Sequence, residues 1–298
     1  MASSHVPKNP DAPQASWRER YGYSFALLVL VGSLLLVAIA WDHARQRELK
    51  LAAEQFRGIA GQQASLVQLQ LNSVEMTLRG GASLFAALDR PTPEQWRGYV
   101  DALRLQATFP SLIGVGYASS LDEQGLVRLQ EAWRADGRGL FELRPRGRRP
   151  LYGPVLYLEP HTDINRTVIG FDLYSEAIRQ HAMRMAMDSG QSQLTGRITL
   201  GRDAGRPSPA LLLLTPVYGQ SLDVDSPATR RSALRGWVFA PFRMDDMLHT
   251  ALSPGRGKMQ LRVVDVTNAT HDVLYQAADL DGPHTFTHSL AMGFYGRR

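Results

Sequence analysis

Residues 168–190 read VIGFDLYSEAIRQHAMRMAMDSG, and this stretch decides the fold class because it changes from one periodicity to another. The apolar run TVIGFDL at 167–173 predicts a buried strand, and the spacing of apolar residues predicts a helix from Glu176 to Met187. Ser175 is expected to cap the helix at its start, and Gly190 is expected to end it. A strand followed directly by a helix indicates a mixed α/β domain.

The same junction places two acids close together in the sequence, which leaves an alternative open. Asp172 and Glu176 would be the acid/base pair of a membrane-anchored hydrolase. No serine–histidine–aspartate arrangement, phosphate loop or metal pair of convincing spacing accompanies them. We therefore favour a structural role for this junction, as framework beside a pocket, and we expect no catalytic residue, no metal and no cofactor.

Composition narrows the possible classes of protein further. The chain has 298 residues, of which 44% are hydrophobic, so it can bury one sizeable core or two small ones. It contains no cysteine, which excludes thiolate catalysis and cysteine-ligated metals. Its net charge of +5 is scattered, apart from the arginines of LRPRGRRP at 143–150, which we expect to form a solvated loop. Nucleic-acid binding is not expected, because no basic stripe with interleaved aromatic residues occurs.

Residues 24–41, SFALLVLVGSLLLVAIAW, carry no charge over eighteen positions. At about 1.5 Å per residue this helix nearly spans a hydrocarbon core of roughly 30 Å, and aromatic residues flank it on both sides. The run is longer than the apolar core of a cleaved signal peptide. We therefore predict an uncleaved transmembrane helix.

A long helix without proline is predicted to continue from residue 42 to 88, within a stalk that covers residues 42–90. Apolar residues recur along it in steps of three and four, with Gln63 in one of the positions and one irregularity around Val67, which is typical of a coiled-coil seam. The seam comprises Leu49, Ala53, Phe56, Ala60, Val67, Leu71, Val74 and Leu78. We expect a parallel homodimer through this seam, because these residues have no evident partner within their own chain.

Beyond the stalk the pattern is mixed. Thr92 and Pro93 predict the start of a helix that runs to about Gln106, and 121–137 predicts a second helix ending at a glycine. Further helices are expected at 176–187 and 244–252. Strands are expected at SLIGVGYASS, LYGPVLYLE, TVIGFDL, GRITL, PALLLLTPVYG, GWVFAPF, MQLRVVDVT and DVLYQ, with GFYGRR in a last strand. The fold class is therefore α+β, with two modules at 91–235 and 236–298.

Seven short blocks in one order carry a resemblance to a known family. They are Phe109-Pro110 with Gly114, Gly116 and Tyr117; Tyr152, Pro154, Val155, Tyr157, Glu159 and Pro160; Gly170 to Leu173 with Ser175 and Glu176; Arg179 with Ala182-Met183; Asp188 to Gly190; Leu194 to Gly196; and Pro216 to Tyr218. This order resembles the CHASE domain, the extracytoplasmic ligand sensor of plant cytokinin receptors and of many bacterial receptors. The resemblance covers about residues 100–245.

The resemblance implies an architecture and a location. A CHASE protein has a stalk helix and two PAS-like lobes, here a membrane-distal lobe at 91–235 and a membrane-proximal lobe at 236–298. The charges on the two sides of the apolar helix do not fix its orientation. The family places the tail 1–23 in the cytoplasm and residues 42–298 in the periplasm, with the anchor in the inner membrane.

The resemblance also implies a function that extends beyond the printed residues. CHASE domains lead through a second membrane span to a histidine kinase, a diguanylate cyclase or a cyclic-di-GMP phosphodiesterase. No such span or motif occurs here, so the chain is expected to be truncated or part of a larger receptor. The ligand and the output domain are left open.

A PAS-like lobe holds its ligand between the sheet and the helices or loops that cover one face. We predict a small-molecule pocket there, with residues that combine an apolar body and a polar group. The predicted ligand-binding residues are Tyr152, Tyr157, Glu159, Phe171, Asp172 and Thr215. Besides this sensor function, a hydrolase and a purely structural dimerisation module without a pocket stay open as alternatives.

Overall fold

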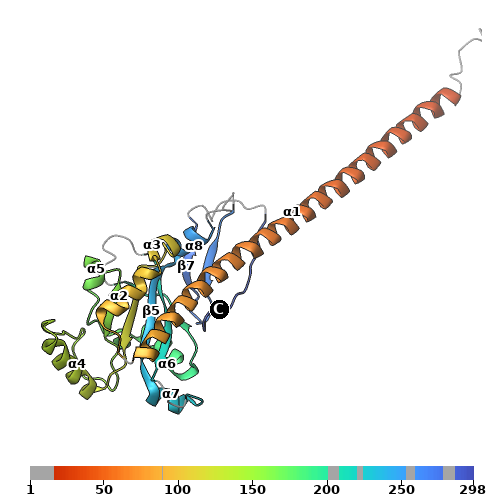
Figure 1. The fold of residues 1–298 in the computed structure, drawn as a ribbon. Coiled ribbons are helices and arrows are strands. Elements are labelled where there is room, and N and C mark those ends of the chain that lie inside the picture. The colour runs from red at the N-terminus through yellow and green to blue at the C-terminus, as the bar shows by residue number, and fades with distance from the viewer. Residues whose placement is uncertain (1–16, 89, 201–207, 220–223, 253–258, 278–285) are drawn as a thin grey trace, which may run out of the picture. The chain divides into compact units, whose positions relative to one another are not determined.

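The computed structural model describes residues 17–88, 90–200, 208–219, 224–252, 259–277 and 286–298 (Figure 1). The chain divides into two units, residues 1–59 and 60–298. Helix α1, Trp17–Leu88, runs through both without a break, as the absence of proline predicts. In the first unit its large apolar side chains from residue 23 to 41 are exposed, and among the described residues one helix is long and apolar enough to cross a membrane. The N-terminal apolar helix is therefore suited to membrane anchoring.

The second unit is built around a five-stranded antiparallel sheet with the strand order β2-β1-β5-β4-β3. The strands are β1, Val115–Ser119; β2, Val155–Glu159; β3, Gln193–Leu194; β4, Ala210–Tyr218; and β5, Leu234–Arg243. β5 pairs with both β1 and β4, and its long pairing with β4 runs from Leu234 to Arg243. The strands expected at 111–120, 151–159, 209–219 and 236–242 are thus confirmed, with observed bounds of 115–119, 155–159, 210–218 and 234–243, and they form the centre of the domain.

Two hydrophobic cores lie on the two faces of this sheet. On one face, Leu71, Val74 and Leu78 of α1 pack with the aromatic residues of α2, Pro93–Ala102, and with α8, Met244–Leu252. On the other face the core is formed with Leu173 and Tyr174 of the short helix η1, Leu173–Ser175, and with Met183 and Met187 of α6, Ala177–Ser189. The remaining helices are α3, Leu105–Thr108; α4, Glu123–Ala135; α5, Asp163–Arg166; and α7, Pro227–Ala233. The fold class is α+β, as predicted.

The expected dimer seam is wrong in its C-terminal half. Leu71, Val74 and Leu78 are 2%, 0% and 0% exposed because they belong to the core of their own domain. They cannot also pack against a second chain. The alternation of threes and fours is the same for a helix on a sheet as for a helix in a coiled coil, so the spacing alone does not separate the two.

The segment 167–173 is not a strand, contrary to the sequence prediction. It makes only isolated bridges, one from Phe171 to Arg144 and one from Asp172 to Pro154. Gly170 has a φ of 83°, which interrupts an extended strand, and the Asp172 carboxylate binds the backbone of the next turn. Similarly, within 197–200 only Ile198 bridges to a strand, at Ala210, and residue 201 lies outside the described residues. GFYGRR at 293–298 forms a turn with a bridge between Phe294 and Arg297, not a strand.

The C-terminal part carries a separate two-stranded sheet. β6, Arg262–Asp265, pairs antiparallel with β7, Asp272–Gln276, which agrees with the two strands predicted there. The expected lobe boundary between residues 235 and 236 falls inside β5, the middle strand of the larger sheet. The strand GWVFAPF therefore belongs to the five-stranded lobe, because its partners β1 and β4 lie earlier in the chain.

Candidate functional site

The junction of η1 and α6 is organised by the buried carboxylate of Asp172. Its Oδ1 accepts hydrogen bonds from the backbone N–H groups of Gly153, at 2.7 Å, and of Tyr174, at 3.0 Å. Its Oδ2 lies 3.2 Å from Nε of Arg149. The Asp172 side chain thus joins the segment just before β2 to η1. The residue is fully shielded from water.

Burial raises the pKa of Asp172 above the ordinary aspartate value. Removal of water from the carboxylate raises its pKa, and the N–H of Gly153 and the charge of Arg149 oppose this shift without cancelling it. Despite the proximity of Arg149, Oδ2 makes no hydrogen bond of acceptable geometry with any described residue. A buried acceptor in this state costs free energy unless another donor reaches it.

Arg179 is the second buried charge of this junction. Its guanidinium donates to the Glu176 carboxylate at 2.9 Å and to the Thr199 carbonyl at 3.0 Å, and it lies 5.6 Å from the ring centroid of Phe171. The side chain is only 9% exposed, yet its Nε–H has no hydrogen-bond partner among the described residues. Asp172 and Arg179 therefore present an unsatisfied acceptor and an unsatisfied donor within one short segment.

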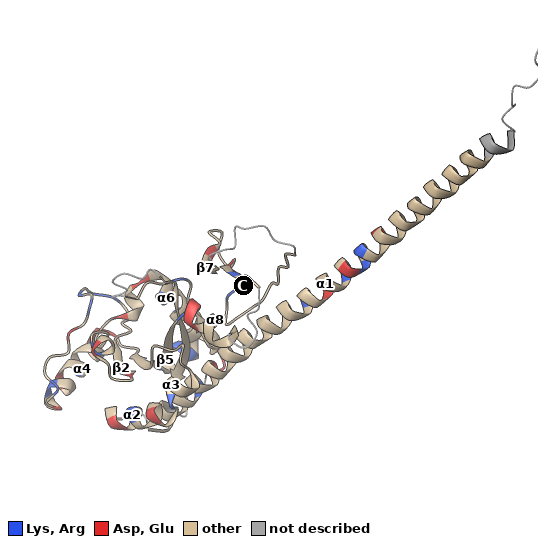
Figure 2. Ribbon diagram, turned by 90° about the horizontal axis from the view of Figure 1, so that it is seen from above, with Lys and Arg blue, Asp and Glu red and all other residues tan. Residues whose placement is uncertain are grey.

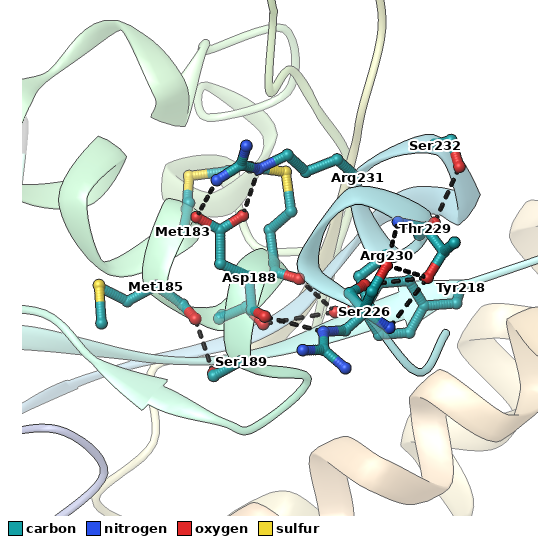
Figure 3. A network of polar contacts seen from close by, with 12 residues as sticks. Met183, Met185, Asp188, Ser189, Tyr218, Ser226, Thr229, Arg230, Arg231 and Ser232 are labelled. Carbon is teal, nitrogen blue, oxygen red and sulfur yellow. Dashed lines mark hydrogen bonds and ion pairs between the residues drawn. The ribbon is translucent and has the colours of Figure 1, made fainter. Parts of the chain in front are cut away.

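Helix α6 is fixed at both ends, which holds Arg179 in place. At the start of α6 the Glu176 carboxylate accepts hydrogen bonds from the backbone N–H groups of Ile178 and Arg179, so Glu176 caps the helix. The prediction that Ser175 is the cap is wrong, because Ser175 is the last residue of η1. At the end of α6 Gly190 adopts φ 72°, the predicted left-handed stop. In the last turn of α6, Asp188 is held by Arg231 of α7 through two ion-pair contacts of 2.7 Å each (Figure 3).

The arginine segment at 143–150 is only partly the solvated loop that composition suggests. Arg146 and Arg148 are 90% exposed at their side chains, as expected. Arg149 is 18% exposed and pairs with Asp172, and Arg144 donates to the carbonyls of Thr167 and Ile169. Sequence reasoning missed Arg149, since nothing in a run of four arginines separates the buried member from the exposed ones. Arg179 had a usable signal: it follows Glu176 by three residues at the start of a helix.

Three of the six predicted ligand residues lie together at this junction. The Tyr152 hydroxyl accepts from the backbone N–H of Arg149 at 3.1 Å, and the Arg149 guanidinium lies 5.6 Å from the Tyr152 ring centroid. Phe171 lies under Arg179, and Asp172 pairs with Arg149. Tyr152 and Asp172 thus share Arg149, whereas Phe171 contacts Arg179.

Tyr157 and Glu159 lie elsewhere, beside α2. The Tyr157 hydroxyl donates to the Pro91 carbonyl at 3.0 Å, its ring packs with Phe85, Trp96 and Tyr117, and burial raises its pKa. The Glu159 carboxylate is 3.4 Å from Nε of Arg97 and 3.9 Å from Nδ1 of His161.

Thr215 occupies a third location, on β4. β2 and β4 are separated by two strands, so Tyr157 and Thr215 are about 14 Å apart at a strand spacing of 4.7–4.9 Å. Thr215 contacts the hydroxyl of Ser192 instead, which in turn contacts Glu75 of α1. The six residues are therefore not on one continuous surface.

Two open hollows of about 470–480 Å³ on the described part of the surface are lined by none of the predicted ligand residues. One is lined by Pro110, Asp246, His249 and Thr250, and the other by residues 266–267 and 293–298. Asp172 and Arg179 are buried, so a ligand that contacts them would need the covering side chains to move apart.

The contacts do not support the hydrolase alternative. Asp172 holds backbone N–H groups and has no exposed surface, and Glu176 caps α6 and pairs with Arg179. Both acids thus have structural contacts, although Oδ2 of Asp172 accepts no hydrogen bond from a described residue.

The fold and this junction define a class: an α+β sensor-type domain, with one antiparallel sheet covered on both faces, behind a long apolar helix. The family model of the CHASE domain matches residues 89–275, more than half of the chain, and the chain belongs to this family. The prediction from the seven sequence blocks is thereby confirmed.

Two solved structures are similar in fold. The ligand-binding domain of the amino acid chemoreceptor PctC from Pseudomonas aeruginosa PAO1, in complex with GABA, is 15% identical, with a TM-score of 0.45 over 76% of this chain and 77% of that one. An extracellular ligand binding receptor from Desulfohalobium retbaense DSM5692 is 10% identical, with a TM-score of 0.43 over 73% of this chain and 31% of that one. No curated protein matches the chain.

Proposed function

We propose that the chain is a membrane-anchored sensor module whose five-stranded lobe binds a small molecule at the η1–α6 junction. Membership of the CHASE family supports a sensor, and the exposed apolar part of α1 supports membrane anchoring. The anchor lies in the inner membrane, with the tail 1–23 in the cytoplasm and residues 42–298 in the periplasm.

One observation carries the location of the site. Asp172 and Arg179 are buried charged residues with an unfilled acceptor and an unfilled donor, and the Arg179 guanidinium lies 5.6 Å from the ring centroid of Phe171, the residue next to Asp172 in the chain. Buried polar atoms are normally hydrogen-bonded, and an exception in a native protein calls for a partner such as an ordered water, an ion or a ligand. A small planar molecule that carries both a donor and an acceptor would satisfy the two groups and stack on Phe171. Tyr152 completes this set, while Tyr157, Glu159 and Thr215 stay predictions.

Binding would be transmitted through a parallel dimer of α1 to an output domain outside these residues, a histidine kinase, a diguanylate cyclase or a cyclic-di-GMP phosphodiesterase. A ligand shifts an equilibrium between two arrangements of the dimer only by its different affinity for each. No chemistry within the sensor is required.

The proposal is tested by thermal unfolding of the full chain in detergent micelles against purines, amino acids and small carboxylates. A compound at a hundredfold excess over its Kd should add about 2.7 kcal/mol to the free energy of unfolding. A purely structural module would show no stabilisation by any compound of the panel.

A further inference from the structure

The segment 194–199 lies along the outer edge of the five-stranded sheet, beside β4. Its residues pair with this strand at three points, Leu194 with Leu213, Thr195 with Leu212 and Ile198 with Ala210. One end of the segment contacts Arg179 of the candidate site, and the other end contacts the turn 294–297. We call residues 194–199 the edge segment.

Two buried arginines hold the edge segment, one at each end. Arg179 of α6 donates a hydrogen bond of 3.0 Å to the carbonyl of Thr199, and Nε of Arg297 donates one of 3.3 Å to the carbonyl of Leu194. The side chains of Arg179 and Arg297 are only 9% and 10% exposed. A hydrogen bond from a charged donor is about twice as strong as one between neutral groups. Movement of either guanidinium therefore displaces the end of the edge segment that it holds.

Gly196, in the middle of the edge segment, is close to both α6 and Arg297. A Cβ atom at this position would lie 3.3 Å from Cγ2 of Ile178 and 3.0 Å from Nη2 of Arg297. Ile178 belongs to the first turn of α6 and immediately precedes Arg179. Because close-packed protein interiors have low compressibility and transmit strain, a shift at the start of α6 is passed to the edge segment and to Arg297.

The turn 294–297 connects the edge segment to two further elements. Nη1 of Arg297 lies 3.3 Å from the carboxylate of Asp265 on β6, whose side chain is 3% exposed. The N–H of Leu194 donates to the Tyr295 carbonyl at 2.8 Å, and the Tyr295 hydroxyl donates to Oδ1 of Asn72 on α1 at 2.8 Å. Figure 1 and Figure 2 both show the end of the chain beside β7. On this side the edge segment is therefore tied to the two-stranded sheet and to α1.

We propose that Arg297 is a positioning residue for the candidate site, and that the edge segment connects this site to α1 and to the two-stranded sheet. Arg297 holds the edge segment, which in turn presents the Thr199 carbonyl that Arg179 binds. The inference rests on the proposed function and adds a route out of the site. A ligand that binds the Nε–H of Arg179 shifts this guanidinium and so changes the contact at Leu194. The effect is reciprocal, because the contact at Leu194 must change the affinity for the ligand by the same factor.

Amide hydrogen exchange of the full chain in detergent micelles tests this connection without a ligand. Arg179→Lys and Arg297→Lys each keep the positive charge but lose the planar fork that contacts a carbonyl and a carboxylate together. Arg179→Lys should speed the exchange of the Val266 N–H, which is hydrogen-bonded just after β6. Arg297→Lys should speed the exchange of the Gln180 N–H, near the start of α6. We expect an increase of about fivefold or more in each case, the lower end of the usual coupling between two sites.

Two exposed arginines provide the matched controls. Arg184 lies on α6 like Arg179, and Arg298 follows Arg297 directly, but both residues are exposed. Arg298 holds the segment after β6 through its backbone, which the substitution leaves in place. Arg184→Lys and Arg298→Lys should therefore leave the exchange at both ends unchanged.

Gly196→Ala covers the case in which a buried lysine unfolds the domain. The added Cβ presses on α6 and on Arg297 at once, so the exchange of the Gln180 and Val266 N–H groups should change together. Effects confined to one end in these variants would overturn the positioning role, even where a ligand binds at the junction. Effects at both ends without any stabilising compound would count against the proposed function and leave the connection standing, so the two can fail separately.

Discussion

The hydroxyl of Ser192 donates a hydrogen bond of 2.8 Å to the carboxylate of Glu75, which lies 117 residues earlier on α1. The same hydroxyl is 2.9 Å from that of Thr215 on β4. Because a serine hydroxyl has one proton, Ser192 donates to Glu75 and accepts from Thr215. All three residues are buried, so this chain of bonds ties the helix to the sheet through the loop before β3.

Ser192→Ala should lower the free energy of unfolding by about 1–3 kcal/mol. The change leaves the buried Glu75 carboxylate without one donor and the Thr215 hydroxyl without an acceptor. Denaturant unfolding of the full chain measures the effect. Ser83→Ala on an exposed position of the same helix is the control and should stay within about 0.5 kcal/mol. A Ser192 variant as stable as this control would refute the role of the bond.

Gly170 and Gly98 should respond in opposite directions to alanine. Gly170 has φ 83°, and an added Cβ would collide with the carbonyl oxygen of Glu142. Gly170→Ala should therefore destabilise by at least about 2 kcal/mol, of which the left-handed backbone accounts for about 1–2 kcal/mol. Gly98 lies inside α2 with nothing near its Cβ position, and Gly98→Ala should stabilise by about 0.5–1 kcal/mol. The measurement is the free energy of unfolding of each variant. Equal changes for the two substitutions would contradict the positive φ and the close contact at Gly170.

Asp172 should make stability depend on pH in the acid range. Burial raises its pKa in the folded protein, so between the ordinary aspartate value and this raised value the folded state binds more protons than the unfolded state. The stabilising contribution of Asp172 is therefore fully present at pH values below its pKa in the unfolded chain. It is lost as the pH rises through its pKa in the folded protein. Asp172→Asn removes this dependence. The stability of the variant relative to the wild type should rise with pH over this window. The opposite slope would mean that the Arg149 pair outweighs burial.

Local signals in the sequence predicted local structure well. Thr92 and Pro93 begin α2, and the Thr92 side chain accepts from the N–H of Gln95 as a capping residue should. Gly190 ends α6 with a positive φ. Both features depend on neighbours within one helical turn, which the sequence displays directly.

Features that depend on distant partners were harder to predict. Leu71 and Val74 have the spacing of a coiled coil, and only the position of the sheet shows that their partners lie in their own domain. The expected lobe boundary cuts β5, because the pairing of β5 with β1 joins residues more than a hundred positions apart and no local pattern shows it. At the site, Asp172 was recognised by its chemistry, whereas its partner Arg149 is distinguished from Arg148 only by burial.

The central claim is that the η1–α6 junction binds the ligand, and calorimetric titration of the most stabilising compound of the panel tests it most directly. Phe171→Ala and Arg179→Lys should abolish binding in protein that remains folded, because they remove the stacking surface and the planar donor. Arg231→Lys is the matched control: this arginine also pairs with a carboxylate, Asp188, but lies on α7, and its variant should bind normally. Normal binding by both junction variants would contradict the account.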